Sequence, residues 1–227
     1  MKIKKLLVAN RGEIAIRIFR ACTEIGIRTV GIYTFEDRYS LHRYKADESY
    51  QVGDDDEPIK PYLDIDEIIQ TALDNEVDAI HPGYGFLSEN ANLADACKKN
   101  NILFIGAEPE VLRSLGDKIT AKKVAQENDV PIIQSNDKDL TSVDIALEEA
   151  DKIGYPVMLK AASGGGGRGM RVIRNEAELK KAFSESQREA KNAFGDETVF
   201  VEKFVENPKH IEIQIIADEH GHVSHLY

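Results

Sequence analysis

The sequence predicts an α/β protein with a parallel sheet in its N-terminal half and a smaller α+β unit after it. Through about residue 110, short apolar runs alternate with helical periods, which is typical of a parallel sheet with helices on both faces. After residue 106 the pattern changes to two helical segments and the polar stretch 134–141, and a second set of helices and strands follows. A run of glycines joins two of these strands.

Composition limits the classes of function open to the chain. Its 227 residues, 42% of them hydrophobic, suffice for two domains, and its net charge of −11 argues against a general nucleic-acid or anionic-membrane surface. Cys22 and Cys97 fall in helical segments, so we expect small core residues in a reducing, cytoplasmic compartment. The apolar residues 6–9 are too few for a signal-peptide core, and no run is long enough to span a bilayer.

The N-terminal half is predicted to alternate strand and helix. Strands are expected at residues 3–9, 28–33, 77–81 and 102–105, and helices at 14–27, 65–75 and 89–100. Ligands gather at the carboxyl ends of the strands in such sheets, where the loops Asn10–Glu13 and His81–Asn90 lie. The second loop is predicted either to carry function or to be a turn in which Tyr84 and Phe86 cover the top of the sheet.

The most informative stretch is Lys160–Met170, with the sequence KAASGGGGRGM. Glycine N–H groups can fold around an anion, and Lys160 and Arg168 add positive charge. A flexible linker is the alternative, but strands predicted at 155–160 and 170–173 place the glycines in a hairpin connection. The spacing fits neither a P-loop nor a dinucleotide-binding turn. We therefore predict a glycine-rich flap that closes over a nucleotide.

Other charged residues of the second half extend this prediction. Helices are expected at 108–115, 118–128, 143–153 and 176–193, and further strands at 198–204 and 210–216. Lys160 falls at a strand end beside the glycines, where an ammonium group can contact phosphate. Lys118, near a helix start, is either an anion contact or a solvated surface residue. His210 lies on the polar face of its strand, which is either a cleft wall or an exposed sheet face.

Five motifs together resemble the biotin carboxylase family of ATP-grasp enzymes over the whole chain. They are ANRGEIAIR (9–17), HPGYGFLSEN (81–90), GDK (116–118), KAASGGGGRGM (160–170) and VEKFVENPKHIEIQ (201–214). Residues 40–50 and 218–227 are most similar to the pyruvate carboxylase branch, as opposed to the biotin carboxylase subunit of acetyl-CoA or another acyl-CoA carboxylase. Among other ATP-grasp ligases, carbamoyl-phosphate synthetase is the nearest competitor.

The resemblance implies two domains. Residues 1–115 would form a Rossmann-like N-terminal domain, and residues 116–227 part of an ATP-grasp region, with its lid at about 134–204 and the start of its core at 205–227. The sequence stops before the family's magnesium-binding glutamates and later catalytic residues. We therefore expect a fragment with no catalytic or metal-ligating residue of its own, and no turnover by this chain alone.

The resemblance further implies a ligase that uses ATP and Mg²⁺ to convert bicarbonate to carboxyphosphate and then carboxylates biotin on a separate carrier domain. In pyruvate carboxylase the carboxyl group continues to pyruvate, giving oxaloacetate, and the full enzyme would be a homo-oligomer. The alternative class is a module that binds nucleotide or assists assembly without catalysis. ADP formation that depends on bicarbonate and biotin distinguishes the two.

Individual residues receive roles from the same resemblance. The residues expected at ATP are Lys118 and Lys160 on the phosphates, Gly165, Gly166, Gly167, Gly169 and Met170 in the flap, Glu202, Lys203, Phe204 and Val205 at the adenine edge, and His210 at the ribose and phosphate side. Tyr84 and Gly85 are expected near the biotin and bicarbonate end. Arg20 and Glu24 are expected at a two-fold dimer contact.

Overall fold

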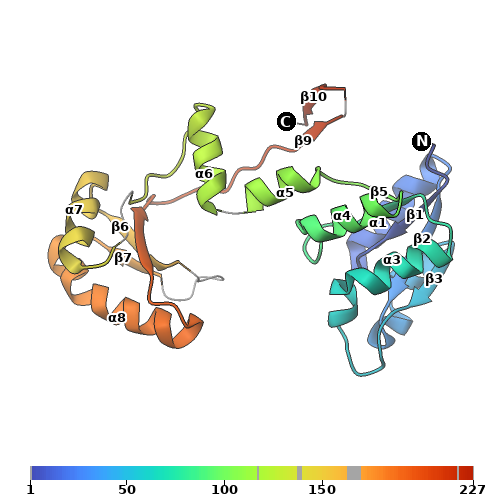
Figure 1. The fold of residues 1–227 in the computed structure, drawn as a ribbon, viewed down its shortest axis with the longest axis horizontal. Helices are drawn as coiled ribbons and strands as arrows, with labels where there is room; N and C mark the ends of the chain where they lie inside the picture. The colour runs from blue at the N-terminus through green and yellow to red at the C-terminus, as the bar shows by residue number, and fades with distance from the viewer. Residues whose placement is uncertain (1, 117, 137–139, 163–169, 219, 227) are drawn as a thin grey trace. The chain divides into compact units, whose positions relative to one another are not determined.

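The computed structural model describes residues 2–116, 118–136, 140–162, 170–218 and 220–226 (Figure 1). The chain divides into two compact units, Met1–Val130 and Pro131–Tyr227, which are described separately below. In the part of the chain that the structure describes, no helix combines the length and the apolar character needed to cross a bilayer.

The first unit is built on a five-stranded parallel sheet in the order β3-β2-β1-β4-β5. Its strands are β1 (Lys5–Val8), β2 (Arg28–Tyr33), β3 (Glu48–Gln51), β4 (Ala79–His81) and β5 (Leu103–Phe104). In the centre, Leu7 lies opposite both Val30 and Ile80. The predicted parallel sheet is confirmed, with one strand more than predicted. The additional strand, β3, has the sequence ESYQ without an apolar run and pairs only at the sheet edge.

Helices cover both faces of this sheet. They are α1 (Gly12–Glu24), α2 (Leu41–Lys45), α3 (Ile65–Asp74) and α4 (Ala91–Lys99), with 3₁₀ turns at Phe35–Tyr39 and Lys60–Leu63, and α5 (Pro109–Gly116) and α6 (Lys118–Glu127) follow β5. Leu7 and Ala9 belong to the core that contains α3 and α4 residues, whereas Leu6 and Val8 pack with α1. A strand buried on both faces must be apolar throughout, which explains the uninterrupted run Leu6–Ala9.

The second unit contains a three-stranded antiparallel sheet in the order β7-β6-β8. The strands are β6 (Val157–Ala161), β7 (Arg171–Ile173) and β8 (Val199–Lys203), and the helices α7 (Val143–Ile153) and α8 (Glu176–Phe194) share a core with them. The predicted hairpin pairing on either side of the glycine run is confirmed, because β6 and β7 are antiparallel neighbours.

The strand predicted over 210–216 is wrong for most of its length. The structure has strand only at β9 (Ile215–Ala217), which pairs with β10 (Val223–His225) in a two-stranded hairpin. Alternating isoleucines form a buried strand face only where another layer covers them. Ile211 and Ile213 are 78% and 57% exposed, so within the described residues no such layer covers this segment.

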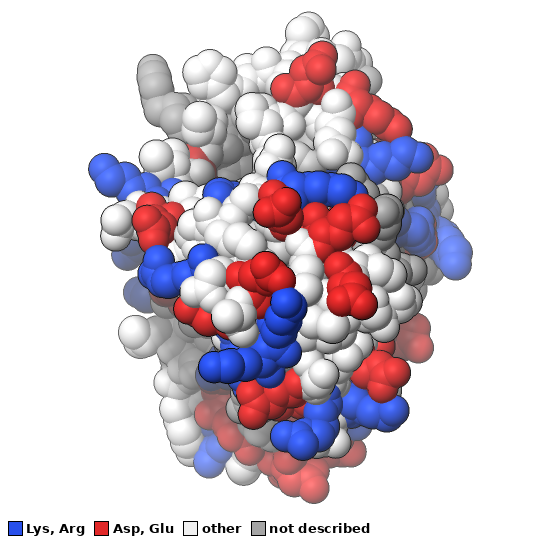
Figure 2. Space-filling view, turned by 90° about the vertical axis from the view of Figure 1, so that its left-hand side faces the viewer, with Lys and Arg blue, Asp and Glu red and all other residues white. Residues whose placement is uncertain are grey.

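Basic and acidic side chains are interleaved on the face that Figure 2 shows. Ion pairs of this kind occur on the second unit, where Arg171 contacts Glu185 and Glu189 at 2.6 and 2.7 Å, and Lys180 contacts Glu176 at 2.5 Å. Exposed pairs contribute only about 0–1 kcal/mol each. The stability of this unit therefore comes mainly from the core between its sheet and its two long helices.

Candidate functional site

Two loops leave the carboxyl ends of neighbouring strands of the parallel sheet and begin side by side. Val8 of β1 lies opposite His81 of β4, and the Ala9 N–H donates to the His81 carbonyl at 2.9 Å. The loop Asn10–Glu13 follows β1 and the loop His81–Asn90 follows β4. The prediction that both loops lie at the carboxyl edge of the sheet is therefore confirmed.

Asn10 connects these two loops through its side-chain amide. Its Nδ2 donates to the carbonyl oxygens of Pro82 at 2.7 Å and Tyr84 at 2.9 Å, and its Oδ1 accepts the Arg11 N–H at 2.8 Å. The residue is buried, with 4% exposure. Gly83, between the two carbonyls, has a φ of +68°, and a Cβ there would lie 2.7 Å from Asn10 Nδ2. Only glycine fits at this position.

A second polar centre forms around the buried Asp37. Arg11 places Nη2 2.9 Å from Oδ1 and Nε 2.8 Å from Oδ2 of this carboxylate. Ser40 Oγ and Tyr62 OH donate to it at 2.7 and 2.8 Å. A buried carboxylate costs free energy unless such donors compensate for its lost hydration. Burial and the hydrogen bond to Asp37 raise the pKa of Tyr62, so its hydroxyl keeps the proton that it donates.

Tyr62 also contacts the second loop through its ring. Phe86 stacks on it, with ring centroids 5.3 Å apart and planes 2° from parallel. Phe86 adopts a φ of +41°, a left-handed conformation that is unfavourable for a bulky side chain. Of the two aromatic residues considered as a cover for the sheet, only Phe86 packs in this way. Tyr84 is 63% exposed.

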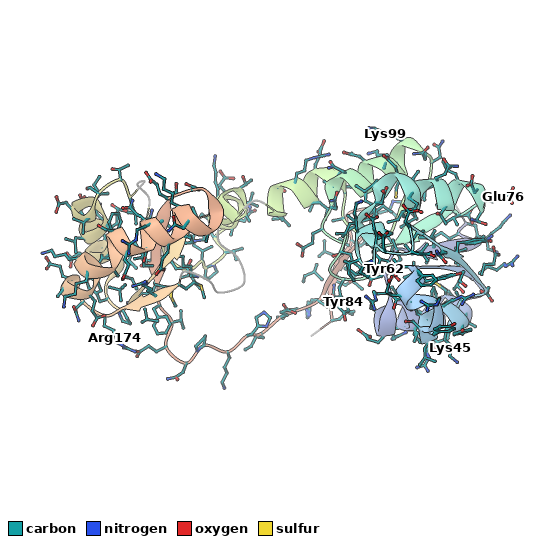
Figure 3. The ribbon with its side chains drawn as sticks, turned by 90° about the horizontal axis from the view of Figure 1, so that it is seen from below. Lys45, Tyr62, Glu76, Tyr84, Lys99 and Arg174 are labelled. Carbon is teal, nitrogen blue, oxygen red and sulfur yellow. The ribbon has the colours of Figure 1, made fainter. Side chains whose placement is uncertain are left out.

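Tyr84 and Gly85 are accessible at the edge of the first unit. Figure 3 shows Tyr84 at the margin of this unit and Tyr62 farther inside. The Tyr84 hydroxyl donates to Glu13 Oε1 at 2.6 Å, and this hydrogen bond raises the pKa of Tyr84. Gly85 has a φ of +65° and open space where a Cβ would be. A ligand can therefore approach both residues.

Two histidines near the same edge are held in neutral form. His42 is fully buried and its Nε2 donates to the Ile32 carbonyl at 3.1 Å. His81 accepts the Gly83 N–H on Nδ1 at 3.0 Å. Burial lowers the pKa of both imidazoles, and for His42 it outweighs the opposing effects of the Ile32 hydrogen bond and of Asp37.

We predict that acidification from about pH 7.5 to about pH 5.5 lowers the free energy of unfolding. The unfolded chain binds protons on both histidines near their ordinary pKa, and the folded chain binds them only at lower pH. The contribution of the two histidines to the free energy of unfolding is therefore fully present at pH values above their ordinary pKa. It decreases as the pH drops below that value, by at most about 1.4 kcal/mol per pH unit for each histidine. Urea denaturation at several pH values measures the slope. His42→Phe should reduce it, and an unchanged slope would contradict the role of His42.

The sheet of the second unit has one covered face and one open face. Val157, Leu159 and Ala161 are buried in the core with the helices, so Met158 and Lys160 lie on the other, partly exposed face. Lys160 forms an ion pair with Glu202 of β8, and their side chains are 26% and 15% exposed. Lys160 thus stands near the end of the strand that leads into the glycine run.

The end of β8 is fixed by groups of the same unit. The Lys203 N–H donates to the Gln134 carbonyl at 2.8 Å, and the Phe204 N–H also bonds within the unit. Lys203 Nζ donates to the carbonyls of Gly154 at 2.8 Å and Tyr155 at 3.3 Å, just past the end of α7. A cation is favourable at a helix C-terminus. The Lys203 side chain is therefore used to join β8 to α7.

The remaining predicted ATP residues are described only in part. Gly165, Gly166, Gly167 and Gly169 lie outside the described residues, as does the side chain of Lys118. Met170 and Val205 are each 45% exposed, and His210 Nε2 lies 3.1 Å from Glu212 Oε1 at an exposed position. Among the residues that the structure does describe, no group of three or more His, Cys, Asp and Glu side chains is arranged to hold a metal ion.

Arg20 and Glu24, the predicted dimer-contact residues, lie exposed on α1. They border an open groove of about 600 Å³, which is also lined by Ile16, Phe19, Thr23 and Lys45. The structure thus leaves both side chains accessible to another protein surface.

Two family models match consecutive parts of the chain. The model described as biotin carboxylase, N-terminal domain, matches residues 2–112, and the model described as carbamoyl-phosphate synthase L chain, ATP binding domain, matches residues 117–227. The chain belongs to the biotin carboxylase family. The first matched domain ends at residue 112 and the second begins at residue 117, whereas the boundary between the two compact units lies between Val130 and Pro131. The domain boundary at residues 115 and 116 stays a prediction.

Curated relatives of this chain include several pyruvate carboxylases. Identity is 53% over 225 residues to that of Bacillus subtilis (strain 168), 54% over 226 residues to that of Staphylococcus aureus (strain Mu50), and 52% over 225 residues to the mitochondrial enzyme of Homo sapiens. Each match covers at least 99% of this chain. The chain spans only about a fifth of the length of these relatives, 19–20%.

Solved biotin carboxylase structures have the same fold. The Campylobacter jejuni biotin carboxylase in complex with β,γ-ATP superposes with a TM-score of 0.85 at 47% identity, and covers 99% of this chain and 50% of its own. The biotin carboxylase domain dimer of Hydrogenobacter thermophilus 2-oxoglutarate carboxylase, with MgADP, ADP and bicarbonate, has a TM-score of 0.84 at 46% identity, with 99% and 49% covered. Rhizobium etli pyruvate carboxylase T882A with acetyl coenzyme A has a TM-score of 0.82 at 52% identity, with 99% and 20% covered.

Sequence patterns do not predict three residues, Asn10, Asp37 and Tyr62, that build the polar contacts at the carboxyl edge of the parallel sheet. Asn10 belongs to the ANRGEIAIR motif, but nothing in the motif shows that its amide reaches the second loop. Asp37 and Tyr62 stand in separate turns without a distinguishing pattern. Only the folded chain shows that they share a hydrogen bond.

Proposed function

We propose that this chain forms the N-terminal part of a biotin carboxylase that uses ATP and bicarbonate to carboxylate biotin through carboxyphosphate. Its role would be in the first half-reaction of a pyruvate carboxylase, after which the carboxyl group passes to pyruvate. The observation that carries the proposal is Lys160, which stands on an open sheet face beside a glycine run. The chain that contains it aligns over 99% of its own length with part of a pyruvate carboxylase.

Lys160 supports a site for the phosphates of a nucleoside triphosphate. A partly exposed ammonium group on an open sheet face is suited to phosphate, and we assign Lys160, together with Lys118, to the ATP phosphates. Gly165, Gly166, Gly167, Gly169 and Met170 would close over them, and His210 would face the ribose and phosphate side.

The adenine edge is assigned to residues 202–205. The N–H groups of Lys203 and Phe204 already donate to carbonyls of their own unit. A backbone contact with adenine would therefore use a carbonyl oxygen of this segment or a backbone group of Val205, which is partly exposed. Glu202 belongs to this segment, and its side chain lies on the same sheet face as Lys160.

In the proposed reaction a bicarbonate oxygen attacks the γ-phosphorus of ATP, and the bond to the bridging oxygen of ADP breaks. The carboxyphosphate formed releases phosphate and CO₂, which the ureido nitrogen of biotin captures as it loses its proton. The lysines of this chain would neutralise phosphate charge, which is the main requirement of phosphoryl transfer. Mg²⁺ adds charge neutralisation when bound, but the described residues do not fit a metal site, and we assign it no ligand here.

The first unit would contribute the biotin and bicarbonate end and a subunit contact. Tyr84 and Gly85 are accessible beside the polar centre at the carboxyl edge of the sheet, which suits residues that meet a substrate delivered on a carrier domain. Arg20 and Glu24 border an open groove, which suits a contact in a homo-oligomer. A cytoplasmic setting is consistent with two free, buried cysteines, although the human relative is named as mitochondrial.

A chimera tests the proposed function directly. The chain replaces the matched N-terminal residues of Bacillus subtilis pyruvate carboxylase, and ADP formation is measured with and without bicarbonate and free biotin. We expect turnover that requires both compounds and that disappears in the Lys118→Gln/Lys160→Gln double variant. A folded chimera that binds ATP but shows no such dependence would support a nucleotide-binding module instead.

A further inference from the structure

The loop that carries Tyr84 and Gly85 has an unusual backbone. Within four residues, Gly83, Gly85 and Phe86 adopt φ values of +68°, +65° and +41°. Two of these positions are glycine, but the left-handed conformation of Phe86 is not a local preference. Such backbones persist only where surrounding structure holds them, and they cluster at functional sites.

Contacts from outside the loop hold this backbone at both ends of the strained segment. On one side, Asn10 donates one hydrogen bond to the Pro82 carbonyl and one to the Tyr84 carbonyl, so both of its amide protons are used. On the other side, Phe86 stacks on Tyr62. Asn10 therefore acts on the peptide that joins Pro82 to Gly83 and on the peptide that joins Tyr84 to Gly85.

We propose that Asn10 is a positioning residue for the biotin and bicarbonate end of the site. Its amide sets the carbonyl of Tyr84, and with it the peptide that joins Tyr84 to Gly85. Asn10 is 4% exposed, so it acts through this loop rather than by touching a substrate. The inference rests on the proposed function, because it takes Tyr84 and Gly85 as the residues near biotin and bicarbonate.

A matched control exists at the other end of the same loop. Asn90 is the N-cap of α4, and its Oδ1 accepts the N–H groups of Asn92 at 2.9 Å and Leu93 at 3.3 Å. Aspartate performs this accepting role equally well. At Asn10 the same substitution removes both donors and turns a carboxylate oxygen toward two carbonyl oxygens. Asn10→Asp and Asn90→Asp thus have the same charge change but opposite consequences for the loop.

Steady-state kinetics in the chimera described above test the proposal. In Asn10→Asp, kcat/KM for free biotin should fall by about tenfold to 100-fold while KM for ATP changes by less than about twofold, because a misplaced loop affects only its own substrate. Asn90→Asp should leave both parameters unchanged. If biotin and ATP parameters fall together, in proportion to the folded fraction, the role of Asn10 is structural only and the proposal is wrong.

Amide hydrogen exchange of the 227-residue chain gives a readout that does not depend on activity. Asn10→Asp should accelerate exchange in the loop after β4, with strands β1 and β2 as protected as in the unchanged chain, and Asn90→Asp should leave the loop unaffected. Unchanged exchange in the loop of Asn10→Asp would overturn the inference. If the chimera that carries the chain without any substitution shows no biotin-dependent turnover, the proposed function is overturned instead. The exchange result would still decide whether Asn10 holds the loop.

Discussion

Replacing Asp37 with alanine is expected to lower the free energy of unfolding of the first unit by about 2–4 kcal/mol. The substitution leaves the Tyr62 hydroxyl buried without its carboxylate acceptor, and removes the two contacts that the Arg11 guanidinium makes with this carboxylate. The Arg11 side chain is 38% exposed, so water compensates part of its loss, and most of the cost falls on Tyr62. Urea denaturation of the chain measures this change.

The neighbouring Glu36 provides the control for Asp37. It is exposed, so Glu36→Ala should change the free energy of unfolding by less than about 0.5 kcal/mol. A double-mutant cycle isolates the hydrogen bond. Once Asp37 is alanine, Tyr62→Phe should cost about 1 kcal/mol less than it does in the unchanged chain. Additive effects of the two substitutions would show that this hydrogen bond does not stabilise the unit.

Lys160→Gln is expected to weaken ATP binding in the chimera by about 1.5–3 kcal/mol, or roughly 10- to 150-fold in Kd. A glutamine retains donors but no longer supplies a positive charge to phosphate. The effect on folding should be smaller, at most about 1 kcal/mol, because the ion pair with Glu202 is partly exposed. Isothermal titration calorimetry with ATP and urea denaturation separate the two effects.

Lys180 provides the matched control for Lys160. It lies in the same unit and also pairs with a glutamate, Glu176, but on the exposed surface of α8. Lys180→Gln should leave ATP affinity unchanged. Equal losses in both variants would show that the general charge of the unit matters and not the position of Lys160, and an unchanged Kd in Lys160→Gln would contradict its assignment to the phosphates.

Most helices and strands follow from local patterns in the sequence. The helix predicted at 143–153 agrees with α7 at both ends, and that at 65–75 extends one residue beyond α3. Both segments have a hydrophobic face and a side-chain N-cap, Ser142 and Asp64, which are local features. The central strands are apolar on both faces, as burial between two helical layers requires.

The errors have a physical cause as well. The edge strand β3 pairs on one side only and is partly exposed, so its residues need not be apolar, and periodicity does not reveal it. The segment 210–214 has strong alternation but no regular structure, because alternation expresses a strand's need for neighbours and does not supply them. The local pattern therefore predicts a strand at 210–214 that is absent and misses β3, because pairing with neighbouring strands, and not the pattern, decides whether a strand forms.

The sequence by itself determined the order of most strands and helices, the pairing expected around the glycine run, and membership of the biotin carboxylase family. These depend on residues close together in the chain. Only the tertiary structure decided that Asn10 reaches Pro82, 72 residues away, and that Asp37 meets Tyr62 across 25 residues. The order β3-β2-β1-β4-β5 places β1 between β2 and β4 and gathers their following loops at one edge. Since local periodicity does not specify which strands become neighbours, this arrangement is a property of the fold.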